Sequence, residues 1–178
     1  MSLQKFISLI KTEALSRSSR FEVIITPPNG VNIASADLER LSLLATNASL
    51  PGLNIEIRDL KIYGPVYPKP VTMDFGGTIA ITFLQDKNLQ TRNFFQEWMF
   101  AVVNPESFNV SYQQNYVSDG ITVTQLDQAD GKTYSYQFLE AFPISLSQST
   151  LDYSNTEFVK FTVEFRYRKW RKLPFNQG

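Results

Sequence analysis

The feature of this sequence that most constrains its fold is a strict alternation of apolar and polar residues near the C-terminal end. From Val159 to Tyr167 every second residue is aliphatic or aromatic, and the residues between them are Lys, Thr, Glu and Arg. Successive side chains of a strand point to opposite faces, so a period of two indicates a strand with one buried face. We therefore expect a strand over 157–168.

Shorter runs predict further strands, separated by residues that favour turns. Residues 31–40 are expected to form a loop with a helical turn after Asp37, and 41–47 is apolar enough for a strand or a helix end. Leu50-Pro51-Gly52 is a firm break. Tight turns are predicted at Asn29-Gly30, Asp119-Gly120 and Asp130-Gly131. The expected strands cover 21–26, 79–83, 108–117, 121–126, 133–139 and 142–147.

Residues 89–103 have the spacing of a helix instead. Their apolar side chains recur three and four positions apart, and Asn104-Pro105 ends the pattern. A stripe this broad and aromatic predicts a helix packed against a sheet, and a ligand pocket is the less favoured interpretation. A short amphipathic helix is also expected over 2–15. The predicted core residues of the longer helix are Phe94, Phe95, Trp98, Met99 and Val102.

A third pattern covers residues 53–76. Ile55 and Ile57 alternate with polar residues, but Leu60 continues on the other parity. Such a slip sends side chains to the opposite face, so a bulge or bend is expected near Arg58-Asp59. Three prolines within 64–70 predict a stiff, extended connection there.

Composition excludes several kinds of site. The 178 residues include no Cys and no His, which removes disulfides, thiolate metal sites, cysteine nucleophiles and the commonest general base. Lys+Arg and Asp+Glu are 17 each, so net charge gives no attraction to nucleic acid or to an anionic membrane. No apolar run approaches the roughly 20 residues of a membrane-spanning helix. We expect a single domain over 1–178 that is not an enzyme and has no cofactor.

Three short motifs have plainer interpretations. Asp74-Phe75-Gly76 spells a kinase metal-binding triplet, but no catalytic loop or Gly-rich loop accompanies it. Ser2 to Lys5 fits the S-x-x-K pattern of penicillin-binding enzymes without its companion motifs. Asp127 with Asp130-Gly131 resembles part of a calcium loop, but the full ligand set is missing, so a hairpin turn is the better interpretation.

A basic cluster from Arg166 to Lys172 surrounds Tyr167 and Trp170. Basic residues interleaved with aromatic ones can hold nucleic acid phosphates. The alternative is an edge strand that its charges keep soluble, followed by a tail over 166–178 that meets a neighbouring subunit. We favour the second interpretation.

The order of these features resembles that of the tail tube proteins of contractile-tailed bacteriophages. The segment from Ser18 to Ile25 resembles their opening strand, and Ala45-Thr46 leading to Leu50-Pro51-Gly52 resembles their A-T-x-x-x-L-P-G passage. Arg92 to Trp98 is similar to the family's charged-x-x-F-x-x-W helix, and the final alternating strand is similar to the one that closes the fold. Two features differ from the family's usual pattern: residues 27–40 are longer than its first hairpin, and the tail is more basic.

The resemblance implies a mainly β fold, a β-sandwich or partly closed antiparallel barrel, with one packed flanking helix and a short N-terminal one. It implies rings of six copies that stack into the inner tail tube, through which DNA leaves without specific binding. Implied partners are further copies, the sheath protein, and the baseplate and terminator proteins, in a virion tail assembled in the host cytoplasm. Type VI secretion and injection-system tubes share this fold.

Within this framework we expect 53–76 to be an arm that joins subunits, because it is long for a connection and would expose apolar surface in a monomer. Two alternatives remain, a tube-initiating baseplate protein of the same fold and a monomeric β-sandwich that binds a ligand. The predicted inter-subunit residues are Ile57, Leu60, Ile62, Tyr63, Pro65, Tyr67, Pro68, Arg168, Lys169, Trp170 and Arg171.

Overall fold

The computed structural model describes residues 3, 4, 7, 19–31, 33–61, 63–149, 151, 152, 154 and 156–174. Within them the protein is mainly β with few helices, as predicted. The helix expected over 2–15 lies outside the described residues except for Leu3, Gln4 and Ile7, and Ile62 lies outside them as well.

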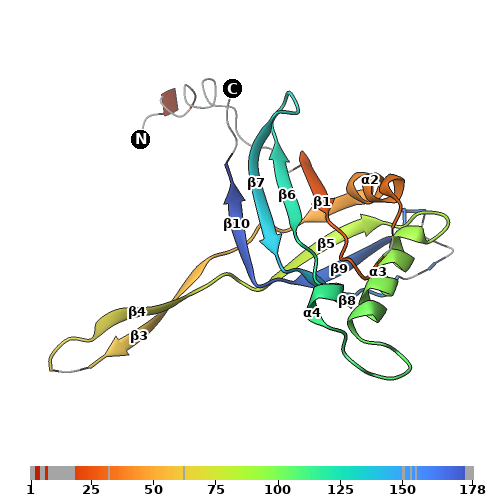
Figure 1. Ribbon diagram of the computed structural model, residues 1–178. Coiled ribbons are helices and arrows are strands. Elements are labelled where there is room, and N and C mark those ends of the chain that lie inside the picture. Colours follow the sequence, from red (N-terminus) through yellow and green to blue (C-terminus); the bar gives the residue numbers. More distant parts are fainter. Residues whose placement is uncertain are drawn as a thin grey trace.

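One four-stranded antiparallel sheet ends in the basic segment. In spatial order its strands are β1 (Phe21–Ile25), β6 (Ile121–Leu126), β7 (Lys132–Leu139) and β10 (Lys169–Leu173). They stand side by side in Figure 1. The segment expected to be a tail is therefore a paired edge strand as far as Leu173, and the expected strand over 157–168 is shorter.

The other four-stranded sheet carries the alternating segment. Its strands, in spatial order, are β2 (Ala45–Ala48), β5 (Thr78–Leu84), β9 (Lys160–Arg166) and β8 (Phe142–Leu146). On β9, Phe161, Val163 and Phe165 are buried while Lys160 and Glu164 are exposed, so the alternation places side chains as expected. The two sheets remain separate and do not close into a barrel.

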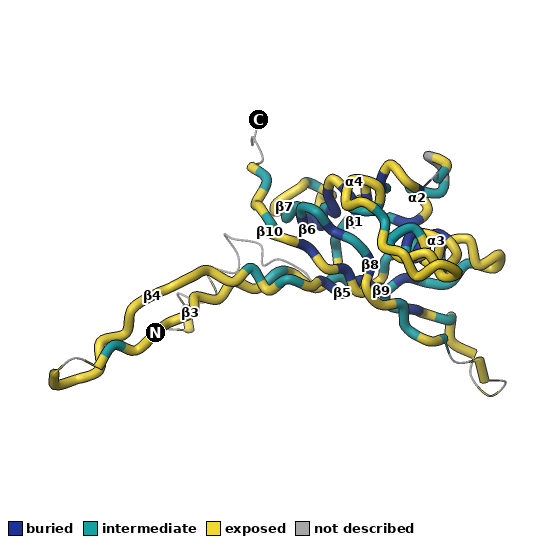
Figure 2. The backbone as a smooth tube through the Cα atoms, turned by 60° about the horizontal axis from the view of Figure 1, so that its bottom comes forward, coloured by how far each residue is buried: buried dark blue, intermediate teal, exposed yellow. Residues whose placement is uncertain are grey.

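Two further strands form a hairpin of their own, β3 (Asn54–Leu60) with β4 (Tyr67–Asp74). The hairpin projects from the body of the molecule (Figure 1), and Figure 2 shows that almost all of it is exposed. We call residues 53–74 the arm. The sequence predicted an extended connection over 64–70, but its second half is a paired strand.

The helices are α2 (Ser35–Leu44), α3 (Gln90–Val102) and the short α4 (Gln113–Tyr116). The helical turn expected after Asp37 within 31–40 is part of a longer helix, because α2 begins at Ser35 and continues to β2; a loop over most of this segment is therefore wrong. The strand expected over 108–117 is also wrong. That segment makes one isolated bridge, Val103 to Val110, and then turns into α4.

The core lies between the two sheets and α3. Phe95 packs against Phe83, Phe161 and Phe165 with ring centroids 5.0 to 6.2 Å apart. Trp98 is fully buried on the same helix face, and its indole Nε1–H donates to the carbonyl of Tyr116 at 2.7 Å. The prediction of one helix packed on a sheet is therefore confirmed, and α3 also fixes the position of α4.

Candidate assembly surface

The arm is a strand pair with no core of its own. Every residue from Gly52 to Asp74 that has a described side chain is exposed, except half-buried Leu60. Its large apolar side chains are nevertheless numerous. The exposed ones are Leu53, Ile55, Ile57, Tyr63, Val66, Tyr67, Val71 and Met73. An isolated two-stranded hairpin is marginally stable in water, so an arm of this composition favours a partner.

The register of the arm presents apolar residues on both of its faces. Ile55 lies opposite Met73, and near the tip Leu60 lies opposite Tyr67. Directly opposed residues share a face, and residues 55 and 60 differ in parity, so these two pairs lie on opposite faces. The predicted bulge is displaced. It falls between Glu56 and Ile57, and pairing is regular through Arg58-Asp59.

Two side chains from the C-terminal segment hold the base of the arm. Trp170 Nε1–H donates to the carbonyl of Gly52 at 3.2 Å, where the arm begins. The Tyr167 hydroxyl donates to the carbonyl of Phe75 at 2.6 Å, where it ends. Burial raises the pKa of Tyr167 above its ordinary value, so the hydroxyl keeps this proton. These contacts fix both ends of the arm to the body.

Three of the basic residues of the predicted tail lie on edge strand β10, Arg168 precedes this strand, and Arg166 is the last residue of β9. Arg168 pairs with Glu140, and the Arg171 Nε–H donates to Gln137 Oε1 at 2.8 Å. Lys172 Nζ lies 3.9 Å from the centre of the Tyr134 ring. Lys169 is exposed. Charged side chains on an edge strand discourage uncontrolled pairing with other edges.

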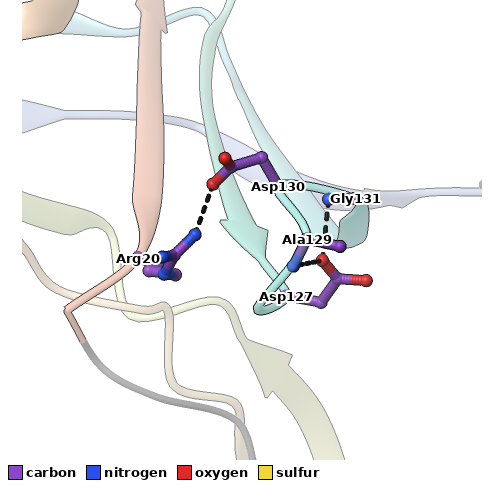
Figure 3. Close-up of polar contacts among 5 residues, drawn as sticks. All are labelled: Arg20, Asp127, Ala129, Asp130 and Gly131. Atoms are coloured by element: carbon purple, nitrogen blue, oxygen red, sulfur yellow. Dashed lines mark hydrogen bonds and ion pairs between the residues drawn. The ribbon is translucent and has the colours of Figure 1, made fainter.

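The predicted turn after β6 uses its carboxylates internally (Figure 3). Asp127 Oδ1 accepts hydrogen bonds from the backbone N–H groups of Ala129 at 2.7 Å and Gly131 at 2.8 Å. Asp130, at a positive φ of 62°, pairs with Arg20 at 2.6 Å. This is the geometry of a turn, and the described residues contain no cluster of metal-ligating side chains.

Most of the predicted inter-subunit residues that the structure describes lie in the arm, and the others lie on or next to edge strand β10. Ile57, Tyr63, Pro65, Tyr67 and Pro68 are exposed on the arm. Trp170 lies half-buried at the base, and its ring packs edge-on against Phe75. Their contacts with neighbouring subunits stay a prediction.

The loop after α3 is an exposed apolar segment for which the sequence predicts a strand instead. It exposes Phe108, Val110 and Tyr112. Their alternating spacing favoured that assignment. The available contrary signal was Asn104-Pro105, which marks a turn.

A family model described as phage tail tube protein matches residues 16–173, a span that includes both sheets, the arm and α3. This chain belongs to the phage tail tube protein family. The resemblance found in the sequence is therefore confirmed. The family is one of structural tube proteins. No curated protein matches the sequence of this family member.

Solved structures agree with this assignment at the level of the fold. A chain of the anti-feeding prophage baseplate is 15% identical, with a TM-score of 0.66 over 90% of this chain and 97% of that one. A chain of the sheath–tube complex of an extracellular contractile injection system is 13% identical, with a TM-score of 0.67 over 98% and 99%. A chain of its sheath/tube terminator is 12% identical, with a TM-score of 0.64 over 91% and 99%.

Among the described residues of this family member, no helix is both long and apolar enough to cross a bilayer.

Proposed function

We propose that this protein is a building block of the inner tube of a contractile tail. Six copies form a ring, the rings stack into a hollow tube, and DNA leaves through the lumen. Its role is structural and not catalytic. Its partners are further copies, a sheath protein, and baseplate and terminator proteins, in a virion tail assembled in the host cytoplasm.

The observation that carries this proposal is the arm. Exposed aliphatic and aromatic side chains occur on both strands and at the tip, and none of the arm's described residues belongs to the buried core. Burying such residues against another subunit recovers roughly 25 cal/mol per Å² of apolar surface. Its prolines stiffen the tip, which lowers the entropy lost on docking. We therefore assign residues 53–76 to contacts between subunits.

The unpaired edges of the two sheets are a second argument for a ring. β1 and β10 are the edges of one sheet, and β2 and β8 are the edges of the other. Unpaired edges are a liability in a free monomer, and closing a ring of identical copies removes them. The zero net charge of the chain leaves close packing of many copies unopposed.

The test is to replace residues 60–70 with a short Gly/Ser linker and to image the purified protein by negative-stain microscopy. The unchanged protein should form rings or long hollow tubes of uniform width. The variant should keep its circular dichroism spectrum and lose the tubes. Normal tubes from the variant, or unfolding, would contradict the role of the arm.

A matched pair of variants separates the arm from general surface hydrophobicity. Ile57→Ser with Met73→Ser removes two exposed apolar side chains from the arm, and Leu43→Ser with Leu151→Ser removes two from elsewhere. Only the first pair should impair assembly. Single rings or short stacks from the unchanged protein would favour a tube-initiating baseplate protein. We consider this alternative because the C-terminal segment is more basic than is usual in the family. A strictly monomeric protein would favour a ligand-binding module.

A further inference from the structure

A second surface of the molecule exposes apolar residues close together. Outside the arm, five of the large apolar side chains that are exposed among the described residues fall between Phe100 and Tyr112, at the end of α3 and in the loop that follows it. We call this set the loop patch, and it consists of Phe100, Val103, Phe108, Val110 and Tyr112.

The loop patch is held in a defined shape by hydrogen bonds from its backbone N–H groups. Asn104 Oδ1 accepts from the N–H groups of Glu106 at 2.9 Å and Ser107 at 3.0 Å, and the carbonyl of Asn104 accepts from Phe108 N–H at 2.9 Å. Val103 and Val110 form a β-bridge across the loop. The loop therefore presents its side chains from an ordered frame.

Phe108 is the residue of this loop that most needs an explanation. Its φ of 57° lies in the left-handed region, which costs a residue other than glycine on the order of 1–3 kcal/mol. The cost is not offset by burial, because Phe108 is 79% exposed. Strained backbone of this kind clusters at functional sites and ligand clamps, so an exposed aromatic ring held on it is a candidate anchor for a partner.

A groove lies beside the loop patch. It has a volume of about 560 Å³ and is lined by Pro27, Pro28, Tyr112, Gln113, Val117 and Asp119. Its two walls are tied together, because Gly30 N–H donates to the carbonyl of Asn115 at 3.0 Å and Ser118 Oγ–H to that of Thr26 at 2.5 Å. The groove is therefore formed before anything binds, which reduces the ordering cost of binding.

The chemistry of the arm tip complements this surface. Tyr63 and Tyr67, with Pro65 and Pro68 beside them, supply rings that suit a groove walled by prolines and Tyr112. Residues 58–69 of the arm include three basic residues and one acidic residue, Asp59, whereas residues 100–119 contain Glu106 and Asp119 and no Lys or Arg. Glu106 and Asp119 lie in the loop and the groove themselves. Opposite charges at the rim favour this pairing over like-charged alternatives.

The two surfaces lie on different sides of the body. In Figure 1 the arm extends to the left, and the loop after α3 descends at the lower right. A contact between different surfaces of identical copies is head-to-tail and repeats from copy to copy, producing a ring or an open stack.

We propose that the loop patch and its groove on one copy receive the arm tip of a second copy. This inference rests on the proposed function, because it names the surface that the same arm binds. It adds that Phe108 and Tyr112 take part in assembly and that Tyr63 or Tyr67 enters the groove.

The absence of cysteine makes a direct test possible. Tyr67→Cys and Tyr112→Cys are combined in one chain, assembled, and treated with a short bis-maleimide that reacts only with thiols. We expect a ladder of linked dimers, trimers and higher species on a denaturing gel. The control combines Tyr67→Cys with Leu43→Cys, which lies 84% exposed on α2 and should produce no ladder.

A second measurement decides the matter if the cysteine variants assemble poorly. Phe108→Ser should raise the protein concentration needed for assembly by roughly tenfold or more and leave the melting temperature of the monomer unchanged. Leu43→Ser is the matched control and should change neither.

The outcomes separate this inference from the proposed function. Tubes that form without the ladder, or normal assembly of Phe108→Ser, would overturn the receiving surface and leave the tube function standing. A ladder with both cysteine pairs would also overturn it, because the contact would then be unspecific. Failure of the unchanged protein to assemble would overturn the proposed function itself.

Discussion

Replacing Trp98 tests whether α3 is the element that holds the two sheets and α4 in one structure. The indole is fully buried, its ring centroid lies 5.7 Å from that of Phe94 and 5.9 Å from that of Phe165, and its N–H holds the carbonyl of Tyr116. Truncating a buried Trp to Ala costs about 3–5 kcal/mol, and the lost hydrogen bond adds about 1 kcal/mol. Because domains of this kind are stable by only about 5–15 kcal/mol, Trp98→Ala should be insoluble or lack fixed packing.

Trp98→Phe is the informative variant, because it keeps an aromatic ring and removes the donor. We expect a loss of about 1–3 kcal/mol from the hydrogen bond and the smaller ring, which lowers the melting temperature of a chain of this size by about 2–12 °C. Thermal unfolding followed by circular dichroism measures this change. Phe100→Ala, on the exposed side of the same helix, is the control and should shift the melting temperature much less. A folded Trp98→Ala with an unchanged melting temperature would refute the reasoning.

Two further predictions concern charged groups. Burial alone would raise the pKa of Asp86, but hydrogen bonds from the N–H groups of Thr91 and Gln90 and from the Thr91 hydroxyl outweigh it and hold the pKa below its ordinary value. Asp86→Ala should therefore cost about 0.5–2 kcal/mol at neutral pH, and the difference should shrink as the pH falls below about 4, in denaturant titrations with Glu97→Ala as control. The basic side chains of β10 should not hold DNA tightly, because several phosphate contacts would oppose sliding. Fluorescence anisotropy should show weak binding of DNA at physiological salt. This binding should change little in a variant in which Gln replaces Arg168, Lys169, Arg171 and Lys172. Tight binding with a steep salt dependence that this variant loses would indicate a nucleic-acid role.

The sequence predicted well those strands and helices in which buried residues recur with the regular spacing of a strand or a helix. On β9 each second residue enters the core, and on α3 the stripe that includes Phe94, Phe95 and Trp98 is buried. Met99 and Val102 are only half-buried at the border of that stripe. Such patterns are local, so one sequence is enough to detect them.

The elements that it missed depend on contacts that are distant in sequence or on local polar geometry. Pro68 and Pro70 argued against a strand, yet both lie on β4. Among the described strands β4 pairs with β3 alone, so one of its edges is free and tolerates residues without an N–H donor. The alternation of Phe108, Val110 and Tyr112 indicated a strand, but the side chain of Asn104 and the left-handed Phe108 turn the backbone away. The order of strands in each sheet is likewise invisible to periodicity.

The arm is separate from the core, and this explains why assembly can be perturbed without unfolding the chain. No described apolar residue from Ser49 to Asp74 belongs to the core or packs on it, and the first to do so after β4 is Phe75. The arm is joined to the body by the contacts of Tyr167 and Trp170 with the backbone at its two ends, and these contacts use no side chain of the arm. Substituting the outer part of the arm therefore removes almost none of the free energy that holds the body together, and what it changes is the contact with the next copy.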